Sequence, residues 1–468
     1  MTDLFRCSAR TLADLIARRE VSSAEVVEAH LGRIAEVNPR LNAIVRVLPD
    51  EARAAALAAD AALAAGEPVG PLHGVPITVK ENIDVAGLPT TQGVAALANV
   101  VAPLDAPVVE RMRAAGAIPI GRTNLPDFGF RVHTDSGLHG LTRNPWNFER
   151  TAAGSSGGEG SALASGMSPL GLGNDIGGSL RNPASACGVS SIRPSFGRVP
   201  SASTTNPADR GMASQLMAVD GPMARRVADV RLALGILSGA HPRDPWSVDP
   251  GSDGKPASRR VAVIEAPPGE ATHPSISDAV RAAADALARA GYEVEPMTPP
   301  DYEAAVELWN SFLLNDLDEL MDQMDALMNP AGRVFLRAAR ATVPHMQSVR
   351  AMSALYGRRD RIARAWSEFM AGTPLVLSPT WTQLPFEHGF DAAAPENAGW
   401  TLRMMRPVVP ANLLGLPSAC TPAGRDADTG LPIGVLVTGP HMRDDLCLDA
   451  AEAIESVLGL ETPIDPAW

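Results

Sequence analysis

Apolar residues in the first seventy positions recur at the spacing of a helix. The clearest series is Val27, Leu31 and Ile34. Residues three or four positions apart lie on one face of a helix, and Ser22 with Glu25 forms a capping box at its start. We expect this helix to end before Pro39. An alanine-rich stretch over residues 51–65 predicts another helix, so the whole region should be helical.

After residue 70 the pattern changes to short β-branched runs that alternate with helical segments. The predicted strands cover residues 74–79, 117–120, 260–265 and 292–294, and the helices between them cover residues 106–115 and 274–290. This alternation is typical of βαβ units and predicts a largely parallel sheet covered by helices. The first of these strands ends at Lys80, whose amine should therefore lie at the end of a buried strand.

The segment 151–197 is rich in glycine, serine and alanine. It contains two blocks, Gly154–Gly158 and Gly173–Ser179. Leucine, isoleucine and methionine are interleaved with the small residues, so a flexible linker is a poor interpretation. The glycines are better explained by close approach of backbones in a buried place.

Composition narrows the classes of function. The 468 residues carry a formal net charge of −13, which argues against nucleic acid or an anionic membrane as a partner. The four cysteines form no C-x-x-C pair, so we expect neither a disulfide framework nor a metal site. The first residues lack the apolar core of a signal peptide, and no run of 18 apolar residues predicts a membrane span. We therefore expect a cytoplasmic protein.

Residues from three of these short patterns could together catalyse hydrolysis of an amide. That reaction needs a nucleophile, a base and hydrogen-bond donors for the tetrahedral oxyanion. Gly177 and Gly178 before Ser179 allow successive backbone N–H groups to face one concavity, and a helix after Ser179 would add the positive end of its dipole. Lys80 can serve as the base if burial keeps it neutral. Ser155, in a glycine-flanked turn, could link Lys80 to Ser179.

The motifs that carry these residues resemble those of the amidase signature family. The similar stretches are GSSGGEG at Gly154–Gly160, DIGGSLRNP at Asp175–Pro183 and HGVPITVKEN at His73–Asn82. Their order and spacing are also similar to the family's, and further similar stretches extend over most of the chain. The resemblance implies an α/β fold: a single α/β/α domain with a large mixed central sheet covered by helices.

This implied domain spans residues 1–468 and replaces the three domains that length alone suggests. Residues 1–70 would form a helical N-terminal segment and residues 73–200 the signature core. Residues 300–370 would form a variable helical segment that covers the substrate pocket.

Carried over residue by residue, the resemblance implies a Ser-Ser-Lys triad. Ser179 would be the nucleophile, Ser155 the relay held by a cis peptide bond after Gly154, and Lys80 the base. The oxyanion hole would consist of the backbone N–H groups of Ile176, Gly177, Gly178 and Ser179. The supporting residues would be Ser156, Asp175 and Arg181. The chemistry implies no metal and no organic cofactor.

Some positions depart from the family pattern. Ala153 occupies a place where glycine is common, and Asn174 one where serine or threonine is common. Ile176 and Asn182 differ from the threonine and glutamine usual in the glutamine amidotransferase members of the family. Asn182 also replaces the arginine that malonamidase-like members use for a substrate carboxylate, so a neutral substrate is favoured. Candidate pocket residues are Phe128, Phe130, Trp309, Phe312, Met321, Met324, Met328, Phe335 and Trp381.

The leading hypothesis is an amidohydrolase that acts on neutral, apolar or aryl amides through an acyl-enzyme, with aryl esterase and carbamate (urethanase) activity. Its partner would be the small-molecule amide, ester or carbamate, and the protein a monomer or homodimer. Two other classes remain: the glutamine-hydrolysing component of a tRNA-dependent amidotransferase, and a non-catalytic amide-binding scaffold. A nucleophile elbow centred on Ser156 is a further interpretation of the GSSGG block, but residues 147–153 make a poor strand before it.

Overall fold

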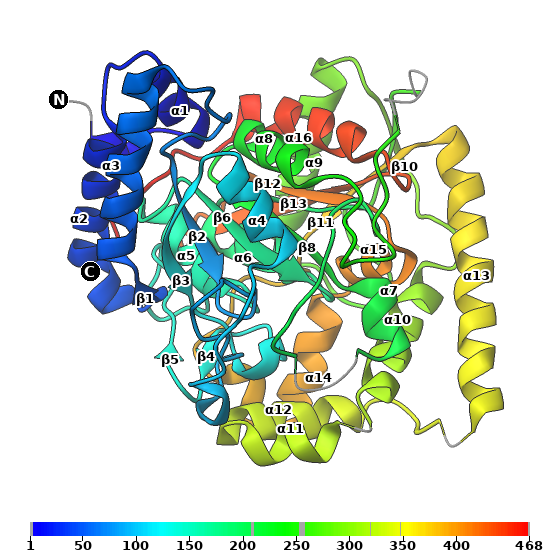
Figure 1. Ribbon diagram of the computed structural model, residues 1–468. Helices are drawn as coiled ribbons and strands as arrows, with labels where there is room; N and C mark the ends of the chain where they lie inside the picture. The colour runs from blue at the N-terminus through cyan, green and yellow to red at the C-terminus, as the bar shows by residue number, and fades with distance from the viewer. Residues whose placement is uncertain (1–2, 207–209, 252–257, 319, 347, 467–468) are drawn as a thin grey trace.

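The buried β-branched runs form the centre of the computed structural model, which describes residues 3–206, 210–251, 258–318, 320–346 and 348–466. In this described part, eleven strands pair into one mixed sheet (Figure 1). In spatial order they are β1 (Ile44–Val47), β3 (Ile118–Thr123), β2 (Pro76–Lys80), β6 (Leu170–Asp175), β8 (Val219–Ala224), β7 (Ser190–Arg193), β12 (Ser418–Arg425), β13 (Pro432–Thr438), β11 (Leu375–Pro379), β9 (Arg260–Val263) and β10 (Glu293–Pro296). A separate small ribbon pairs β4 (Asp135–Ser136) with β5 (Gly140–Leu141).

The sheet is not largely parallel, so that expectation is wrong. Four of the ten described pairings are parallel: β2 with β3 and β6, and β9 with β10 and β11. These include both predicted βαβ units. The other six pairings are antiparallel. One of them, β1 with β3, is at the edge of the sheet, and the other five occupy its middle. There β12 and β13 are joined by a short turn, and a connection that short produces an antiparallel pair.

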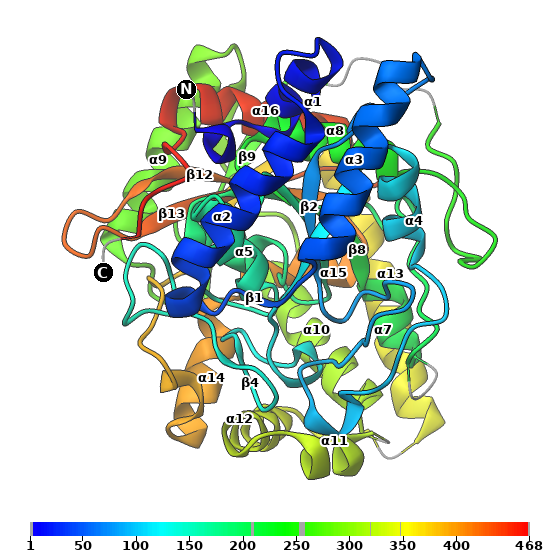
Figure 2. The same cartoon turned by 60° about the vertical axis from the view of Figure 1, so that its left-hand side comes forward.

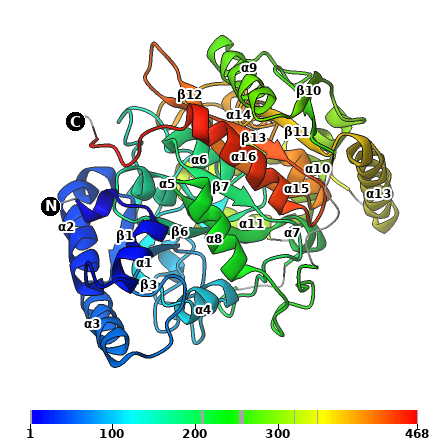
Figure 3. The same ribbon diagram turned by 90° about the horizontal axis from the view of Figure 1, so that it is seen from above.

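Helices cover both faces of this sheet. Figure 3 shows α8, α9 and α16 lying across one face, whereas α10, α11, α12 and α14 gather on the opposite side in Figure 1. The helices are α1 (Ala9–Ala17), α2 (Ser23–Leu41), α3 (Pro49–Ala65), α4 (Pro107–Ala114), α5 (Gly157–Ala164), α6 (Arg181–Cys187), α7 (Met212–Met217), α8 (Val227–Leu237), α9 (Pro274–Arg289), α10 (Tyr302–Asp316), α11 (Met321–Leu327), α12 (Pro330–Arg340), α13 (Val349–Gly372), α14 (Pro395–Met404), α15 (Val409–Leu414) and α16 (Asp444–Leu458). Short 3-10 helices are η1 (Leu4–Arg6), η2 (Ala95–Leu97), η3 (Asp127–Gly129) and η4 (Phe390–Ala392).

The N-terminal region confirms the capping box and corrects two details. Ser22 accepts from the Glu25 backbone, and the Glu25 side chain accepts from Ser22. Pro39 lies inside α2 rather than beyond its end. The region also contains β1, which pairs with β3 at the edge of the sheet and was not predicted among the helices. Figure 2 shows α2 and α3 side by side on the outside of the molecule.

No helix in the described part of the chain combines the length and apolarity needed to cross a membrane. The segment predicted to be helical over residues 300–370 contains α10 to α13, apart from residues 319 and 347, which lie outside the described ranges. Of these helices, α10 and α11 contribute residues to the cavity into which the ends of β2 and β6 open.

Candidate active site

Lys80 is the last residue of β2, and its amine is fully buried at the end of that strand. Its Nζ donates to Ser155 Oγ at 2.7 Å and to Asn174 Oδ1 at 2.6 Å. No carboxylate of a described residue forms an ion pair with it. The side chain is thus held by two neutral acceptors, as a lysine that exchanges protons with a serine would require.

Burial lowers the pKa of Lys80 from an ordinary 10.5 to about 7. The nearby charges of Asp175, Asp220 and Glu159 oppose that shift. Removing an ammonium group from water costs free energy unless it is paired, and the neutral amine is therefore favoured. A substantial fraction of this lysine is neutral at neutral pH, which makes it competent as a base.

Ser155 follows a cis peptide bond with Gly154, as the resemblance predicts. The preceding Ala153 has a positive φ of 59°, a region that favours glycine. Ser155 is buried, and its hydroxyl accepts from Lys80. Within the described residues Ser155 makes no hydrogen bond to Ser179, although both line one cavity. The hydrogen bond expected between Ser155 and Ser179 is therefore not formed in the described structure.

Ser179 lies in the sharp turn between β6 and α6. Asp175 shapes this turn: it accepts from the backbone N–H groups of Gly178 at 2.7 Å and Leu180 at 3.2 Å, and from Arg181 Nε at 3.0 Å. Burial acts to raise the pKa of Asp175, but the charge and hydrogen bonds of Arg181 outweigh it and the pKa is lowered. This buried ion pair holds the turn that presents the Ser179 hydroxyl to the cavity.

The same turn limits which backbone groups can bind an oxyanion. The Gly178 N–H, expected in the oxyanion hole, donates to the Asp175 carboxylate instead, so this part of the prediction is corrected. The N–H groups of Ile176, Gly177 and Ser179 have no acceptor among the described residues. Trp309 Nε1 donates to the Ile176 carbonyl at 2.9 Å and orients that peptide. Three donors therefore remain for a developing negative charge.

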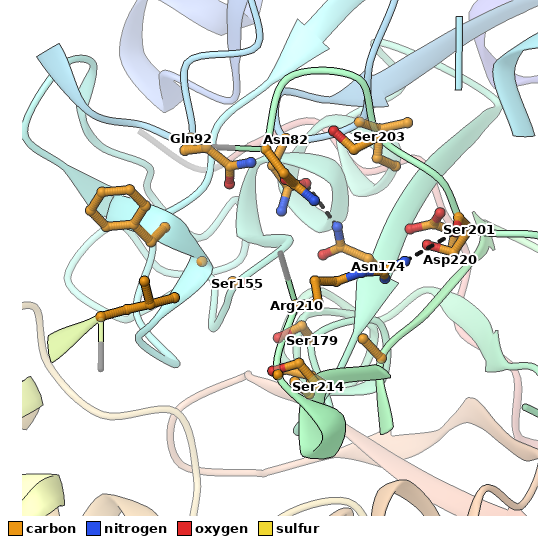
Figure 4. Close-up of a pocket in the computed structure, with 18 of the residues that line it drawn as sticks. Asn82, Gln92, Ser155, Asn174, Ser179, Ser201, Ser203, Arg210, Ser214 and Asp220 are labelled. Carbon is orange, nitrogen blue, oxygen red and sulfur yellow. Dashed lines mark hydrogen bonds between the residues drawn. The ribbon is translucent and has the colours of Figure 1, made fainter. Parts of the chain in front are cut away.

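Two cavities meet at Ser179. The larger, of about 360 Å³, also reaches Ser155 and Asn174 (Figure 4). Its polar side includes Asn82, Gln92, Ser201, Ser203, Arg210 and Asp220, and its apolar side includes Phe128, Leu317, Leu320, Met324 and Leu327. The smaller, of about 60 Å³, is lined mainly by apolar side chains, among them Phe130, Trp309 and Phe335.

The structure therefore brings only some of the predicted pocket residues to a cavity wall. Phe128 and Met324 line the larger cavity, and Phe130, Trp309 and Phe335 line the smaller. The other predicted residues are packed nearby. Met321 and Met328 pack around Leu336, Phe312 is buried against Tyr356, and Trp381 donates to Asn182 Oδ1 at 2.9 Å.

Sequence reasoning missed three polar residues of this site. Asn82 accepts from Asn174 Nδ2 at 2.9 Å, Asn412 donates to Asp175 at 2.8 Å, and Asp220 lines the larger cavity. Asn82 belongs to the lysine motif, so its place next to Lys80 was a usable signal. Asn412 and Asp220 come from distant segments, and no local pattern links them to the serine motifs.

The elbow interpretation receives no support from this geometry. Residues 147–153 contain only isolated bridges before the GSSGG block, at Arg150 and Thr151, and no strand. The Ser156 hydroxyl is buried and has no hydrogen-bond partner in the described structure. Ser179, by contrast, opens onto both cavities. The nucleophile position therefore fits Ser179.

Comparison with known proteins gives consistent matches over almost the whole chain. The family model described as Amidase matches residues 25–448. An indoleacetamide hydrolase of Bradyrhizobium diazoefficiens (strain USDA 110) is 43% identical over 98% of this chain and 87% of its own. The A component of the glutamyl-tRNA(Gln) amidotransferase of Salinispora arenicola (strain CNS-205) is 33% identical over 99% of both chains. Among solved structures, a bacterial aryl acylamidase of the amidase signature family covers 98% of this chain and 96% of its own, with a TM-score of 0.83 and 28% identity.

Proposed function

This chain belongs to the amidase signature family of hydrolases that cleave amide bonds, and we propose that it acts on neutral, apolar or aryl amides through Ser179, Ser155 and Lys80. The observation that carries the proposal is the buried Lys80 amine. It donates a hydrogen bond to Ser155, and burial lowers its pKa to about 7. A lysine in ordinary solvent would be almost entirely protonated at neutral pH and could not act as a base.

In the proposed reaction, Ser179 Oγ attacks the carbonyl carbon while its proton passes through Ser155 to Lys80. The oxyanion forms next to the free N–H groups of the Ile176–Ser179 turn. Lys80, now protonated, returns a proton through Ser155 to the leaving nitrogen, and the amine departs. Water then hydrolyses the acyl-enzyme by the same route and releases a carboxylic acid.

The lining of the cavities supports an uncharged, partly apolar substrate. Leu317, Leu320, Met324 and Leu327 form one wall of the larger cavity, and aromatic residues surround the smaller one. Adaptable Met and Leu side chains suit apolar groups of varied shape. The indoleacetamide hydrolase relative and the aryl acylamidase neighbour both carry names that indicate aryl substrates, which agrees with this preference.

We extend the proposal to aryl esters and aryl carbamates. Both present a carbonyl to the same nucleophile, and an aryl alcohol leaves more easily than an amine because it needs no proton. From an N-aryl carbamate, the carbonic half-ester released after deacylation would lose carbon dioxide. This extension rests on chemistry alone and is the first part of the proposal to test.

The test is a matched panel: indole-3-acetamide, phenylacetamide, phenylacetanilide, a carboxylate-bearing amide, phenyl acetate and an aryl carbamate, ranked by kcat/KM. We expect hydrolysis of the aryl amides by wild-type protein and none by Ser179→Ala. Hydrolysis of carboxylate-bearing amides in preference to neutral ones would contradict the assigned substrate class. A folded Ser179→Ala protein that keeps the wild-type rates would contradict the assigned nucleophile.

An amidotransferase role is the second candidate, because the Salinispora arenicola amidotransferase component is 33% identical over 99% of this chain. That role would make glutamine the amide and would need tRNA and a second protein. Ile176 and Asn182 differ from the residues usual in such amidotransferase components, and the chain carries a net charge of −13. Including glutamine in the panel separates the two: release of ammonia from glutamine, and not from aryl amides, would favour the transferase.

A further inference from the structure

Asp220 is an acidic residue near Lys80, and the proposed reaction gives it no role. It lies on β8 and is the direct cross-strand partner of Asn174 on β6. Side chains of paired residues in an antiparallel sheet project from the same face and lie about 5 Å apart. Asn174 holds the Lys80 amine at 2.6 Å, so Asp220 lies beside the residue that binds the base, one strand further along the sheet. Figure 4 shows Asn174 and Asp220 at the wall of the larger cavity.

The charges of three carboxyl groups raise the pKa of Lys80, each from a different element: Asp175 at the end of β6, Glu159 on α5 and Asp220 on β8. The first two have structural partners. Asp175 is bonded to Arg181 and to Asn412. Glu159 accepts from the hydroxyls of Thr78 and Thr123 and is not among the residues that line the cavity.

Asp220 lines the cavity where the reaction would occur, as Asp175 does, but unlike Asp175 it forms no ion pair with an arginine among the described residues. Ser201 hydrogen-bonds to its side chain, and the charges of Arg210 and Asp244 act on it from the loops that follow β7 and α8. Of the three carboxyl groups, it is therefore the one that lines the cavity without an ion pair of its own in the described structure.

We propose that Asp220 is a positioning residue for the base, and that its carboxylate stabilises the protonated form of Lys80 that arises when Ser179 attacks. The inference rests on the proposed function. A base at this position has two duties. It must be neutral before attack, and it must hold the proton long enough to return it to the leaving nitrogen. Burial serves the first duty, and a fixed negative charge nearby serves the second.

The charges agree with this assignment. Burial raises the pKa of Asp220 to about 6, against the hydrogen bond from Ser201 and the charges of Arg210 and Lys80. Asp220 is therefore ionised over the range above pH 6, in which Lys80 titrates. Opposite charges a few ångströms apart favour each other's ionised forms, so loss of the Asp220 charge should make Lys80 a weaker base.

The test compares Asp220→Asn with the matched control Asp316→Asn. Asp316 also lines the larger cavity, where it accepts hydrogen bonds from the N–H groups of Ala213 and Ser214 at the start of α7. Its charge is not one of those that raise the pKa of Lys80. Both variants remove one negative charge from one cavity. We expect Asp220→Asn to move the acid limb of the kcat/KM profile about one unit to lower pH, and Asp316→Asn to leave its midpoint in place. Asp220→Asn should also slow anilides several-fold more than aryl esters, which need no proton on the leaving group.

Lysine NMR supplies a measurement that does not depend on activity. The chain contains two lysines, Lys80 and Lys255, so protein labelled at lysine should give two titrating side-chain signals, assigned with Lys255→Arg. We expect a lower titration midpoint for Lys80 in Asp220→Asn and a midpoint restored toward wild type in Asp220→Glu. An unchanged Lys80 midpoint in a folded Asp220→Asn protein would overturn the inference. Failure of the wild type to hydrolyse any amide would instead overturn the proposed function, and the NMR result would still stand.

Discussion

Replacing Asn174 by aspartate should keep Lys80 protonated at neutral pH, so that it cannot act as a base, while leaving the geometry of the site in place. Asn174 Oδ1 lies 2.6 Å from Lys80 Nζ, so Asn174→Asp puts a carboxylate directly against the amine with no change of shape. The Asn174 Nδ2 bond to Asn82 would be lost, but the Asn82 amide can rotate and donate to the new carboxylate. The variant thus adds one negative charge to the group that accepts the hydrogen bond from Lys80 Nζ.

The size of the effect follows from the pKa of Lys80, which burial lowers to about 7. At that value about half of the lysine is neutral at pH 7. An opposite charge in contact raises a pKa by roughly one to three units. A rise of about two units would leave roughly 1% of the lysine neutral at pH 7, so kcat/KM should fall about 50-fold there. The loss should disappear by about pH 10, where the lysine of the variant is again neutral.

The assay is the pH profile of kcat/KM for phenylacetanilide from about pH 6 to 10, together with the Lys80 titration by lysine NMR. Asn174→Thr is the matched control, because it alters the contact without adding charge. We expect the kinetic and NMR midpoints of Asn174→Asp to rise together by about two units. A kinetic midpoint that stays at the wild-type value while the NMR midpoint rises would refute Lys80 as the group that controls activity.

Four further substitutions test other parts of the site. Ser179→Ala should lower kcat by at least about 10³-fold with the fold intact, as expected for loss of a nucleophile, whereas Ser156→Ala should remain active; the elbow interpretation expects the reverse, and steady-state kinetics of both decides. Gly177→Ala should lower kcat sharply, because its Cβ would lie 2.5 Å from a Trp309 ring carbon and displace the oxyanion turn; near-wild-type kcat would show that the turn is not involved. Trp309→Phe removes the hydrogen bond to the Ile176 carbonyl and should cost about 1–3 kcal/mol in unfolding free energy, measured by denaturant titration with wild type as the control; no change would mean that water replaces the bond.

Local patterns predicted the parts of the site that lie within short segments. The β-branched run before Lys80 identified a buried strand with the amine at its end, and the structure confirms that strand as β2. The glycine-serine blocks identified both turns because each turn needs small residues at consecutive positions. Such features depend on neighbours in the sequence and can therefore be predicted from it.

Other parts depend on pairings between distant segments, which no local pattern reports. Asp220 reaches the site through the register between β6 and β8, and Asn412 bonds to Asp175 across 237 residues of sequence. β1 is a strand because β3 offers it an edge, despite its position between two helices. The methionines of α11 illustrate the same limit: Met324 reaches the cavity while Met321 packs beside it, a difference set by how the helix is seated.

The most direct test of the account is to identify the residue that a fluorophosphonate labels. The reagent phosphonylates an activated serine, and peptide mapping by mass spectrometry locates the adduct. We expect the adduct on Ser179, with labelling slowed by at least about 10²-fold in Lys80→Met because the base is missing. An adduct on Ser156, or labelling at the wild-type rate without Lys80, would contradict a nucleophile at Ser179 activated by Lys80.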